Sequence, residues 1–468
     1  MLCARHFWSG SAAATQEKYA RNFMTELQVF VTVTVLFGLI VVLLLDWLDM
    51  TVAGLLSVSL LIVFGILSEK DVLNVVSSGG GVLALLFGGM VVARTLTPTG
   101  IFENVGARFL ILTRGSGKRF LLGLILLIAP VCAFLPNATV VILLAPVIIR
   151  VAAALEVSFV APMILAAIIS NSAGLLTLVG DPATFLVGSA MGMTFIEYLG
   201  RVALGGLLVL LALIPLLPLL IKDIWTVRRR LPNEISLPRL QEPLLGVLAL
   251  LLLAAMAMLF LFGELLPIQM VPPAVAIVVC SLALLIVYAV KVEPVQKVLG
   301  DIDWKTLIFI ACMFVLVEAL VKAGFLQTVA DDIFRRFGTN HLAVGLFLLL
   351  VVGLVSTVLA NIPVVAASVL MVKSYFVISQ NVPEEALGAG FTDWPLTTLP
   401  VFVAMMFGGT LGGNATLIGA SANIVSGGIC AAHGKPIRFM KFMRYGVPIT
   451  LAQLTVAAIY VTAMYYLL

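Results

Sequence analysis

The sequence predicts an all-α integral membrane protein built from two related halves that are inverted relative to each other. Of the 468 residues, 62% are hydrophobic and only 11% are charged, whereas a soluble domain is about half apolar and about a quarter charged. Apolar stretches such as 30–45 and 244–262 approach the roughly 20 residues that a helix needs to cross the bilayer core. A membrane β-barrel would instead show alternating segments of about ten residues.

An internal repeat supports the two halves. VLALLFGGMVVARTLTPTGIF aligns with TLIFIACMFVLVEALVKAGFL, which places Gly324 at an offset of 224 residues from Gly100. The same offset carries LPNATVV onto LANIPVV, and therefore Asn137 onto Asn361. Further along, TLVGDPAT (177–184) matches TLIGASAN at an offset of 239 residues. Matches over such a length favour a duplication.

Both halves contain the same series of elements. In the first half we expect spans at 27–45, 51–67 and 80–95, an amphipathic stretch, a segment 119–155 broken at Pro136-Asn137, an interrupted span 159–191 and a span 197–221. In the second half we expect spans at 244–262, 271–290 and 305–321, an amphipathic stretch, a segment broken at Asn361, an interrupted span 397–430 and a span 443–468. The predicted division is a polar tail 1–26, a first membrane repeat 27–221, a linker 222–243 and a second membrane repeat 244–468.

The topology follows if each broken segment is a re-entrant hairpin. Each half then crosses the membrane five times, and an odd number of crossings inverts the second half. With the N-terminus outside, two thirds of the 27 lysines and arginines fall in inner loops, as the positive-inside rule requires. The linker 222–243 is then cytoplasmic, and the net charge of +4 reflects topology rather than nucleic-acid binding.

The surroundings of the chain are predicted from the same features. The lipid bilayer is the expected partner, and the short loops suit the inner (plasma) membrane of a bacterium. The first 23 residues are polar and are not expected to act as a signal peptide. Met24, which directly precedes the first span, is an alternative start.

The breaks predict a polar site at mid-membrane depth. The run GGTLGGNATLIGASANIVSGG (408–428) lies between apolar spans, and backbone without helical hydrogen bonds is tolerated there only where it is buried in protein or lines a wet cavity. Glycines permit close packing and left-handed dihedral angles. The candidate substrate- or ion-binding residues at the breaks are Asn137, Thr139, Asn171, Thr177, Gly180, Asp181, Thr184, Asn361, Asn414, Thr416, Ser421 and Asn423.

Each break also predicts a helix that starts inside the membrane. Asp181-Pro182 is typical of an N-cap followed by proline at the first helical position. Asn137 and Asn361 can cap the second arms of the hairpins, and Ser421 can start the last half-helix. Four converging helix N-termini would favour anions, whereas unwound carbonyls could hold Na⁺ instead. The sodium candidates are the positions near Asn137, Gly180, Asn361 and Gly419.

The charged residues inside the spans need separate interpretations. Asp181 either carries a proton or binds Na⁺, or it only caps a helix, and both roles stay open. Glu318 and Lys322 lie four residues apart and are expected to neutralise each other. Arg94 lies at a span end and is expected to snorkel to the interface.

Catalysis has little support in the sequence. No HExxH, Walker or GxSxG motif is present. The five cysteines show no CxxC spacing and are interpreted as small buried hydrophobic residues. We therefore predict a protein that is not an enzyme and needs no cofactor, with H⁺ or Na⁺ as coupling ion.

These motifs resemble those of the ion transporter superfamily. The matching stretches are PNATVVILLAPVIIR, SNSAGLLTLVGDPAT, ANIPVV and GGNATLIGASANIVSGGICAAHGKPIRFMKFMRYG. This superfamily contains the arsenite/antimonite permeases, D-type Na⁺/H⁺ antiporters, silicon-efflux transporters and the P protein, with dicarboxylate/citrate symporters as more distant relatives. The resemblance implies an elevator transporter of ten or eleven spans with two hairpins, assembled as a homodimer.

The resemblance also implies where the binding loops lie, and where this chain differs. The loops map onto Asn137, 177–184, Asn361 and 414–423. Many P-protein-like members carry Asp-Asn at both hairpin tips, but proline and alanine precede the two asparagines here. Many also read GDPPN where this chain reads GDPAT. Two carboxylates and one amide are thus missing, which favours anions or neutral hydroxides over cations.

The leading hypothesis is a secondary active transporter, an exporter, of a small inorganic anion or a metalloid hydroxide coupled to H⁺ or Na⁺. The first alternative is a Na⁺/H⁺ antiporter that uses Asp181. Further alternatives are a di- or tricarboxylate symporter and a passive anion channel.

Overall fold

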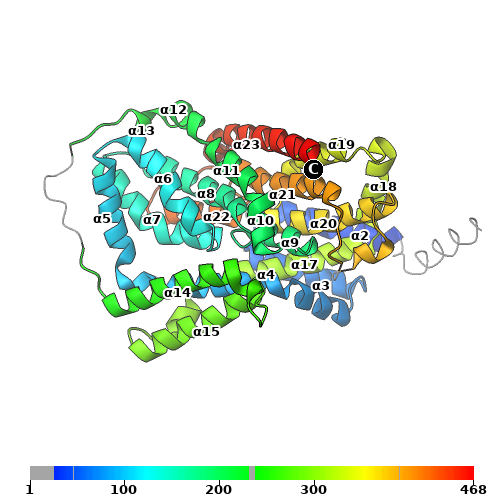
Figure 1. Cartoon of the computed structure of the whole chain (residues 1–468), viewed down its shortest axis with the longest axis horizontal. Coiled ribbons are helices and arrows are strands. Elements are labelled where there is room, and N and C mark those ends of the chain that lie inside the picture. The colour runs from blue at the N-terminus through cyan, green and yellow to red at the C-terminus, as the bar shows by residue number, and fades with distance from the viewer. Residues whose placement is uncertain (1–25, 46, 231–237, 389–390) are drawn as a thin grey trace, which may run out of the picture.

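The computed structural model describes residues 26–45, 47–230, 238–388 and 391–468, which are mostly helical and contain no β-strand (Figure 1). The predicted tail up to residue 25 and the linker residues 231–237 lie outside the described part of the chain. The first half contains α2 (Glu26–Leu44), α3 (Met50–Val63), α4 (Glu69–Thr95), α5 (Ile101–Thr113), α6 (Gly117–Cys132), α7 (Asn137–Ala154), α8 (Val160–Ala173), α9 (Pro182–Ala190), α10 (Phe195–Arg201), α11 (Ala203–Leu211) and α12 (Leu217–Leu220). The linker begins with α13 (Lys222–Trp225).

The second half repeats this series. It contains α14 (Pro243–Phe262), α15 (Pro272–Val290), α16 (Val295–Gly300), α17 (Trp304–Lys322), α18 (Phe325–Phe337), α19 (His341–Ser356), α20 (Asn361–Ile378), α21 (Leu399–Gly412), α22 (Ser421–Ala432) and α23 (Phe439–Leu467). Among the described residues, nine helical segments are long and apolar enough to cross a membrane. The predicted all-α membrane class is confirmed, whereas elevator motion stays a prediction.

The two halves share backbone geometry at the predicted breaks. Pro136 (φ −56°, ψ 137°) precedes α7, and Ala360 (φ −56°, ψ 140°) precedes α20. Gly100 and Gly324 have left-handed φ angles of 74° and 69° directly before α5 and α18. Only glycine adopts this conformation without strain, so the aligned glycines turn the chain in the same way in both halves.

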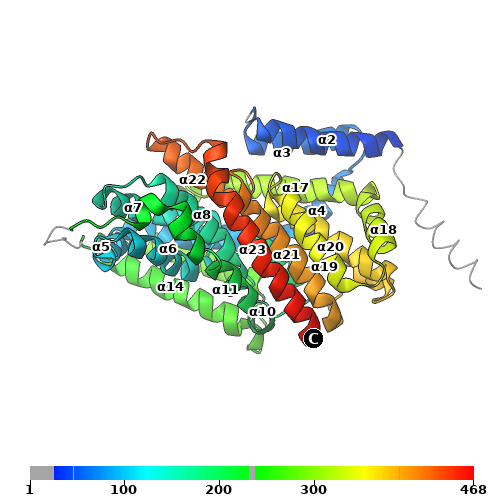
Figure 2. The same ribbon diagram turned by 90° about the horizontal axis from the view of Figure 1, so that it is seen from above.

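The first helices of each half pack against one another. Both α3 and α4 contact α17, and α4 also contacts α15. Figure 2 shows α2 and α3 along one edge of the molecule, next to α17. Figure 1 shows α14 and α15 side by side along another edge. We call these helices, α2–α4 and α14–α17, the peripheral layer.

The remaining helices form a core in which the two halves cross over. Helix α9 of the first half contacts α20 and α21 of the second, and α22 of the second half contacts α7 and α8 of the first. Every residue of α8 and α21 is buried. The crossing brings the two interrupted spans together at the centre of the protein, where polar groups need internal partners.

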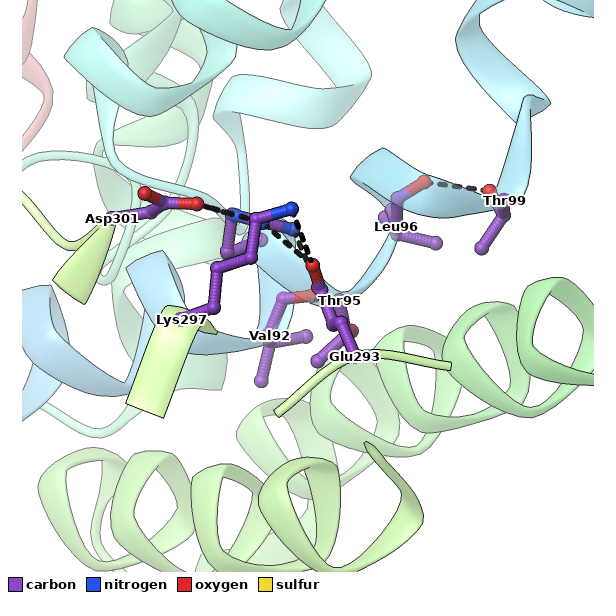
Figure 3. A network of polar contacts seen from close by, with 8 residues as sticks. Val92, Thr95, Leu96, Thr99, Glu293, Lys297 and Asp301 are labelled. Carbon is purple, nitrogen blue, oxygen red and sulfur yellow. Dashed lines mark hydrogen bonds and ion pairs between the residues drawn. The ribbon is translucent and has the colours of Figure 1, made fainter. Parts of the chain in front are cut away.

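Arg94 does not snorkel, so that prediction is wrong. Its Nη1 and Nη2 donate to the two carboxylate oxygens of Glu293 at 2.9 and 3.1 Å, and its Nε and Nη2 donate to Asp301 Oδ2 at 3.0 and 2.7 Å. Figure 3 shows Glu293, Lys297 and Asp301 gathered at this end of α4. Two carboxylates therefore hold the guanidinium and tie α4 to the segment between α15 and α17.

Arg94→Gln is expected to lower the free energy of unfolding by about 2 kcal/mol, because it removes the main partner of a buried carboxylate. The Glu293 side chain is only 7% exposed, and Lys297 Nζ lies 3.5 Å from it. Thermal unfolding in detergent measures the change. The matched control is Lys297→Gln: the Lys297 side chain is 62% exposed, and such an exposed ion pair contributes less than about 1 kcal/mol to stability. Equal losses for both variants would contradict the assignment.

Lys322 pairs with a different carboxylate from the one predicted. Its Nζ lies 2.5 Å from Asp71 Oδ2, near the start of α4, and no ion pair joins it to Glu318. The hydrogen bond from Lys322 lowers the pKa of Asp71 to about 2. Glu318 keeps no ion-pair partner among the described residues. The expected mutual neutralisation of Glu318 and Lys322 is therefore wrong.

Loops that the predicted topology places on the inner side of the membrane, next to Arg114, Arg150, 222–239 and 435–444, contact one another. Arg229 pairs with Glu156 at 3.1 Å, and its backbone N–H donates to the Gly115 carbonyl at 2.8 Å. Lys435 Nζ lies 4.9 Å from the centre of the Phe159 ring. These contacts agree with the predicted topology. Which side faces the cytoplasm stays a prediction.

Candidate functional site

Both interrupted spans unwind in the same way. After α8, the 3₁₀ turn η2 (Gly174–Leu176) leads to extended backbone at Thr177 (φ −137°, ψ 162°). After α21, the 3₁₀ turn η7 (Gly413–Ala415) leads to extended backbone at Thr416 (φ −130°, ψ 163°). The Thr177 hydroxyl donates to the carbonyl of Ala133, and the Thr416 hydroxyl donates to the carbonyl of Thr357. Because Ala133 and Thr357 are themselves 224 residues apart, each break is tied to the same position of its own broken segment.

The motif glycines serve close packing. A Cβ on Gly180 would lie 2.8 Å from the Gly174 carbonyl oxygen, and a Cβ on Gly419 would lie 2.6 Å from the Gly413 carbonyl oxygen. None of these four glycines has a positive φ angle. Close approach of two backbone segments is thus the reason for these glycines. The predicted left-handed dihedral angles are wrong for them.

The four predicted helix starts are confirmed, with α9 beginning at Pro182, but the predicted side-chain caps are not. Helices α7, α20 and α22 begin at Asn137, Asn361 and Ser421. Asp181 occupies the N-cap position before Pro182, and the backbone N–H of Ala183 faces its carboxylate, but without the geometry of a capping hydrogen bond. The Asn137 side chain does not cap α7, and Asn361 Oδ1 accepts only from the next residue's N–H, at 3.0 Å. The polar side chains at these helix starts are thereby left for other partners.

One polar cluster links the two halves and is saturated with hydrogen bonds. Asn171 Nδ2 donates to Asn414 Oδ1 at 3.1 Å and to Asn423 Oδ1 at 3.0 Å. Asn414 Nδ2 donates to Ser172 Oγ at 3.1 Å and to Gln453 Oε1 at 2.9 Å. Asn423 Nδ2 donates to two backbone carbonyls at 2.8 Å. These five residues are at most 1% exposed. Because their groups already have partners, the cluster holds the core together rather than offering free groups to a ligand.

A second cluster keeps unpaired oxygen atoms. Asn137 Nδ2 donates to Asp181 Oδ1 at 3.0 Å, and the side chains of Asn361 and Thr410 also face this carboxylate. Asn137 Oδ1, Asp181 Oδ2 and Thr410 Oγ1 are buried without a hydrogen-bond partner. No ion pair among the described residues involves Asp181, which is 2% exposed. A buried carboxylate with no counter-charge and one unpaired oxygen is costly unless a proton, a cation or water satisfies it.

One small cavity adjoins this second cluster, and a larger one lies nearby. The smaller has a volume of about 10 Å³ and is lined by Asp181, Pro136 and Phe185 among others, which is enough for about one water molecule or small ion. The larger measures about 740 Å³ and lies between α9 and α20 on one side and α4, α15 and α17 on the other. We call it the vestibule. Phe185 lines both cavities, so this side chain lies between the vestibule and the small cavity beside Asp181.

The vestibule carries charges of both signs. Lys373 of α20 is 3% exposed, donates to the Gly388 carbonyl at 3.0 Å and lies 5.7 Å from the centre of the Trp394 ring. Glu318 of α17 and Glu264 line the same cavity. A lysine buried in an apolar helix is expensive and is a functional candidate.

The other predicted residues are placed as follows. Thr184 Oγ1 donates to the Gly174 carbonyl at 3.3 Å, and Gly180 packs against that carbonyl. Thr139 and Ser421 are half-buried and form no side-chain hydrogen bond with described residues. The four cysteines in the described part of the chain are free and buried, and no group of three or more His, Cys, Asp or Glu there could hold a metal ion.

Sequence reasoning missed four residues. Thr410 lies in the quoted glycine-rich run and is 239 residues after Asn171, so the repeat offset could have found it. Lys373 is the only charged residue of α20, which was an available signal. Ser172 lies in the quoted stretch SNSAGLLTLVGDPAT, which was an available signal. Gln453 carried none, because only its partners across the core distinguish it from an ordinary polar residue of a membrane helix.

Comparisons with known proteins identify relatives along most of the chain. The profile of the CitMHS family, described as "Citrate transporter", matches residues 40–389. An uncharacterized transporter of Synechocystis sp. is 38% identical over 425 residues, which cover 91% of this chain and 95% of that protein. A 46 kDa membrane protein of Mycobacterium leprae is 29% identical over 90% of this chain and 95% of its own length. The P protein of Homo sapiens is 25% identical over 93% of this chain and 60% of its own length.

Proposed function

The chain belongs to the CitMHS citrate transporter family, and we propose that it is a secondary active transporter that moves a small anion together with H⁺ or Na⁺. The resemblance to the ion transporter superfamily is confirmed by the family match and by the similarity to the P protein. The observation that carries the finer proposal is the buried Asp181 carboxylate, whose Oδ2 has no partner beside two other unpaired oxygens.

The chemistry of this cluster favours movement of cation and anion in the same direction. An anion beside an ionised Asp181 would be repelled in a region of low dielectric constant. A proton or Na⁺ on the carboxylate removes that repulsion and also satisfies the unpaired oxygen. The N-termini of α7, α9 and α20 then offer partial positive charge to the anion. Each ion therefore promotes binding of the other, which is the thermodynamic basis of symport.

The vestibule supports access for both ions. Lys373 provides a cation within its wall, and Glu318 and Glu264 provide carboxylates. The substrate class follows from two sources. The family description names citrate, whereas the missing carboxylates at the hairpin tips favour small inorganic anions or metalloid hydroxides. Metalloid hydroxides offer O–H donors to Asn137 Oδ1 and Asp181 Oδ2. With inward gradients of H⁺ or Na⁺, symport means uptake, which we propose in place of the export hypothesised from the sequence. A homodimer in a bacterial inner membrane stays part of the proposal.

Na⁺/H⁺ antiport through Asp181 is the second candidate. The observation in its favour is that the three unpaired atoms, Asn137 Oδ1, Asp181 Oδ2 and Thr410 Oγ1, are all oxygens, the ligand type that hard cations prefer. In that case H⁺ and Na⁺ would compete for one carboxylate, and no anion would be required.

A flux assay separates the candidates. The purified protein is reconstituted in liposomes that contain a pH-sensitive dye, and Na⁺ or H⁺ gradients are imposed with citrate, a dicarboxylate, chloride or arsenite outside. We expect ion movement only when an accepted anion or hydroxide is present. Proton movement driven by Na⁺ alone would establish antiport instead. A dye signal no larger than that of protein-free liposomes, under every gradient and with every solute, would refute transport of these solutes.

A further inference from the structure

We infer that the crevice beneath α18 is a binding site for one phosphatidylethanolamine molecule, whose acyl chain fills the crevice and whose headgroup binds Asp332 and Arg336. The crevice has a volume of about 470 Å³ and lies between α17, α18, α19 and α20, with Leu36 of α2 at its edge. Asp181 does not line it, and Val317 is the one lining residue that it shares with the vestibule.

The lining of the crevice has the chemistry of a lipid tail site. Apart from Asp332, Arg336 and Ser368, all its lining residues are apolar, and the Ser368 hydroxyl already donates to a backbone carbonyl of its own helix at 2.7 Å. Phe325, Val351 and Val355 line it and are 45%, 39% and 40% exposed. In a membrane-spanning protein, such an apolar opening faces lipid, and an acyl chain gains packing contacts there.

The position of α18 sets the depth of this site. Its residues Leu326, Ala330 and Ile333 are buried, whereas Asp331, Asp332, Arg335 and Arg336 gather in its last two turns. Four charged side chains so close together are too costly for the hydrocarbon region, so this end of α18 lies at the lipid headgroups. Figure 2 shows α18 at the edge of the molecule, beside α20.

Two neighbouring charge pairs on α18 behave differently. Arg335 pairs with Asp331 at 3.7 Å and neither lines the crevice. Asp332 and Arg336 both line it, and neither has an ion-pair or hydrogen-bond partner among the described residues. Residues four apart on a helix lie on one face, with roughly 6 Å between their Cβ atoms. The free carboxylate and guanidinium thus point from adjacent turns toward one headgroup.

Phosphatidylethanolamine matches this pair of charges. A guanidinium binds phosphate oxygens in a bidentate manner, and a carboxylate accepts hydrogen bonds from a primary ammonium. The two groups of this headgroup are joined by a two-carbon bridge, so both can be reached at once. Phosphatidylcholine lacks ammonium N–H donors, and phosphatidylglycerol lacks the ammonium.

Lipid binding to the full chain in detergent tests this inference, with native mass spectrometry and lipid-induced shifts in melting temperature as readouts. We expect phosphatidylethanolamine to bind about tenfold more tightly than phosphatidylcholine or phosphatidylglycerol, as one lost charge-assisted hydrogen bond implies. Asp332→Asn and Arg336→Gln should each weaken it by a similar factor. The matched controls Asp331→Asn and Arg335→Gln should leave it unchanged.

A second variant tests the tail site without touching a charge. Val351→Trp fills the crevice from a partly exposed position and should abolish the bound lipid while the protein still folds. Equal binding of all three lipids, or equal effects of both charge pairs, would overturn the inference and indicate ordinary annular lipid. Sensitivity to Arg336→Gln alone would overturn the ethanolamine assignment.

Discussion

Asp181→Asn is expected to abolish ion-coupled uptake, with a fall of about a hundredfold or more, as for loss of a required proton-transferring group. The substitution keeps the size of the side chain and an oxygen that can accept from Asn137 Nδ2, which now lies 3.0 Å from Asp181 Oδ1. It removes the only group of the cluster that can take up a proton or balance the charge of Na⁺. The measurement is accumulation of the anion against its gradient in proteoliposomes.

The control for this variant is Asp223→Asn, which removes an exposed carboxylate from α13 in the linker. It should accumulate the anion like the unmodified protein. Melting temperatures of both variants establish that they are folded. Undiminished uphill accumulation by Asp181→Asn would remove Asp181 from the coupling mechanism. Loss of uptake in both variants would mean that general charge, not the buried carboxylate, is responsible.

Asn414→Ala is expected to destabilise the protein by about 2–4 kcal/mol. Single hydrogen bonds between membrane helices average about 0.6 kcal/mol, but this truncation does more than delete bonds. It leaves Gln453 Oε1 and one N–H of Asn171 without the partners that they have now. Each buried polar atom left unsatisfied costs about 1–3 kcal/mol. Thermal or denaturant unfolding in detergent measures the loss.

The comparison variant is Asn137→Ala, because both asparagines are buried and the sequence predicts both as binding residues at breaks in membrane spans. Asn137 Oδ1 has no partner, and its Nδ2 makes one hydrogen bond, to Asp181. We therefore expect Asn137→Ala to lower transport while it changes the melting temperature much less than Asn414→Ala does. The reverse order of melting temperatures would contradict the distinction between a saturated and an unsaturated cluster.

The elements of the fold could be predicted because each leaves a local signal. Apolar length predicts the spans, and proline, glycine and asparagine predict where they break. Helices α7, α20 and α22 begin at the predicted residues. The repeat strengthened these predictions, since Asn137 and Asn361 mark the same break in the two halves.

Individual side-chain partners could not be predicted in this way. Arg94 and Lys322 were assigned to neighbours in sequence or to the lipid interface, but they bind carboxylates on other helices. Spacing along a helix shows which side chains share a face. It does not show which carboxylate from a distant segment arrives there.

The composition and the repeat of this sequence determined the membrane class, the positions of the breaks and the list of polar residues at the centre. Only the tertiary structure divided that list. It joined Asn171, Asn414 and Asn423 into a network without free groups, and it left Asp181 beside unpaired oxygens. The physical reason is that satisfaction of a buried polar atom depends on partners more than 200 residues away, such as Asn414 for Asn171. Helix packing brings these partners into contact, and no local pattern records whether they meet.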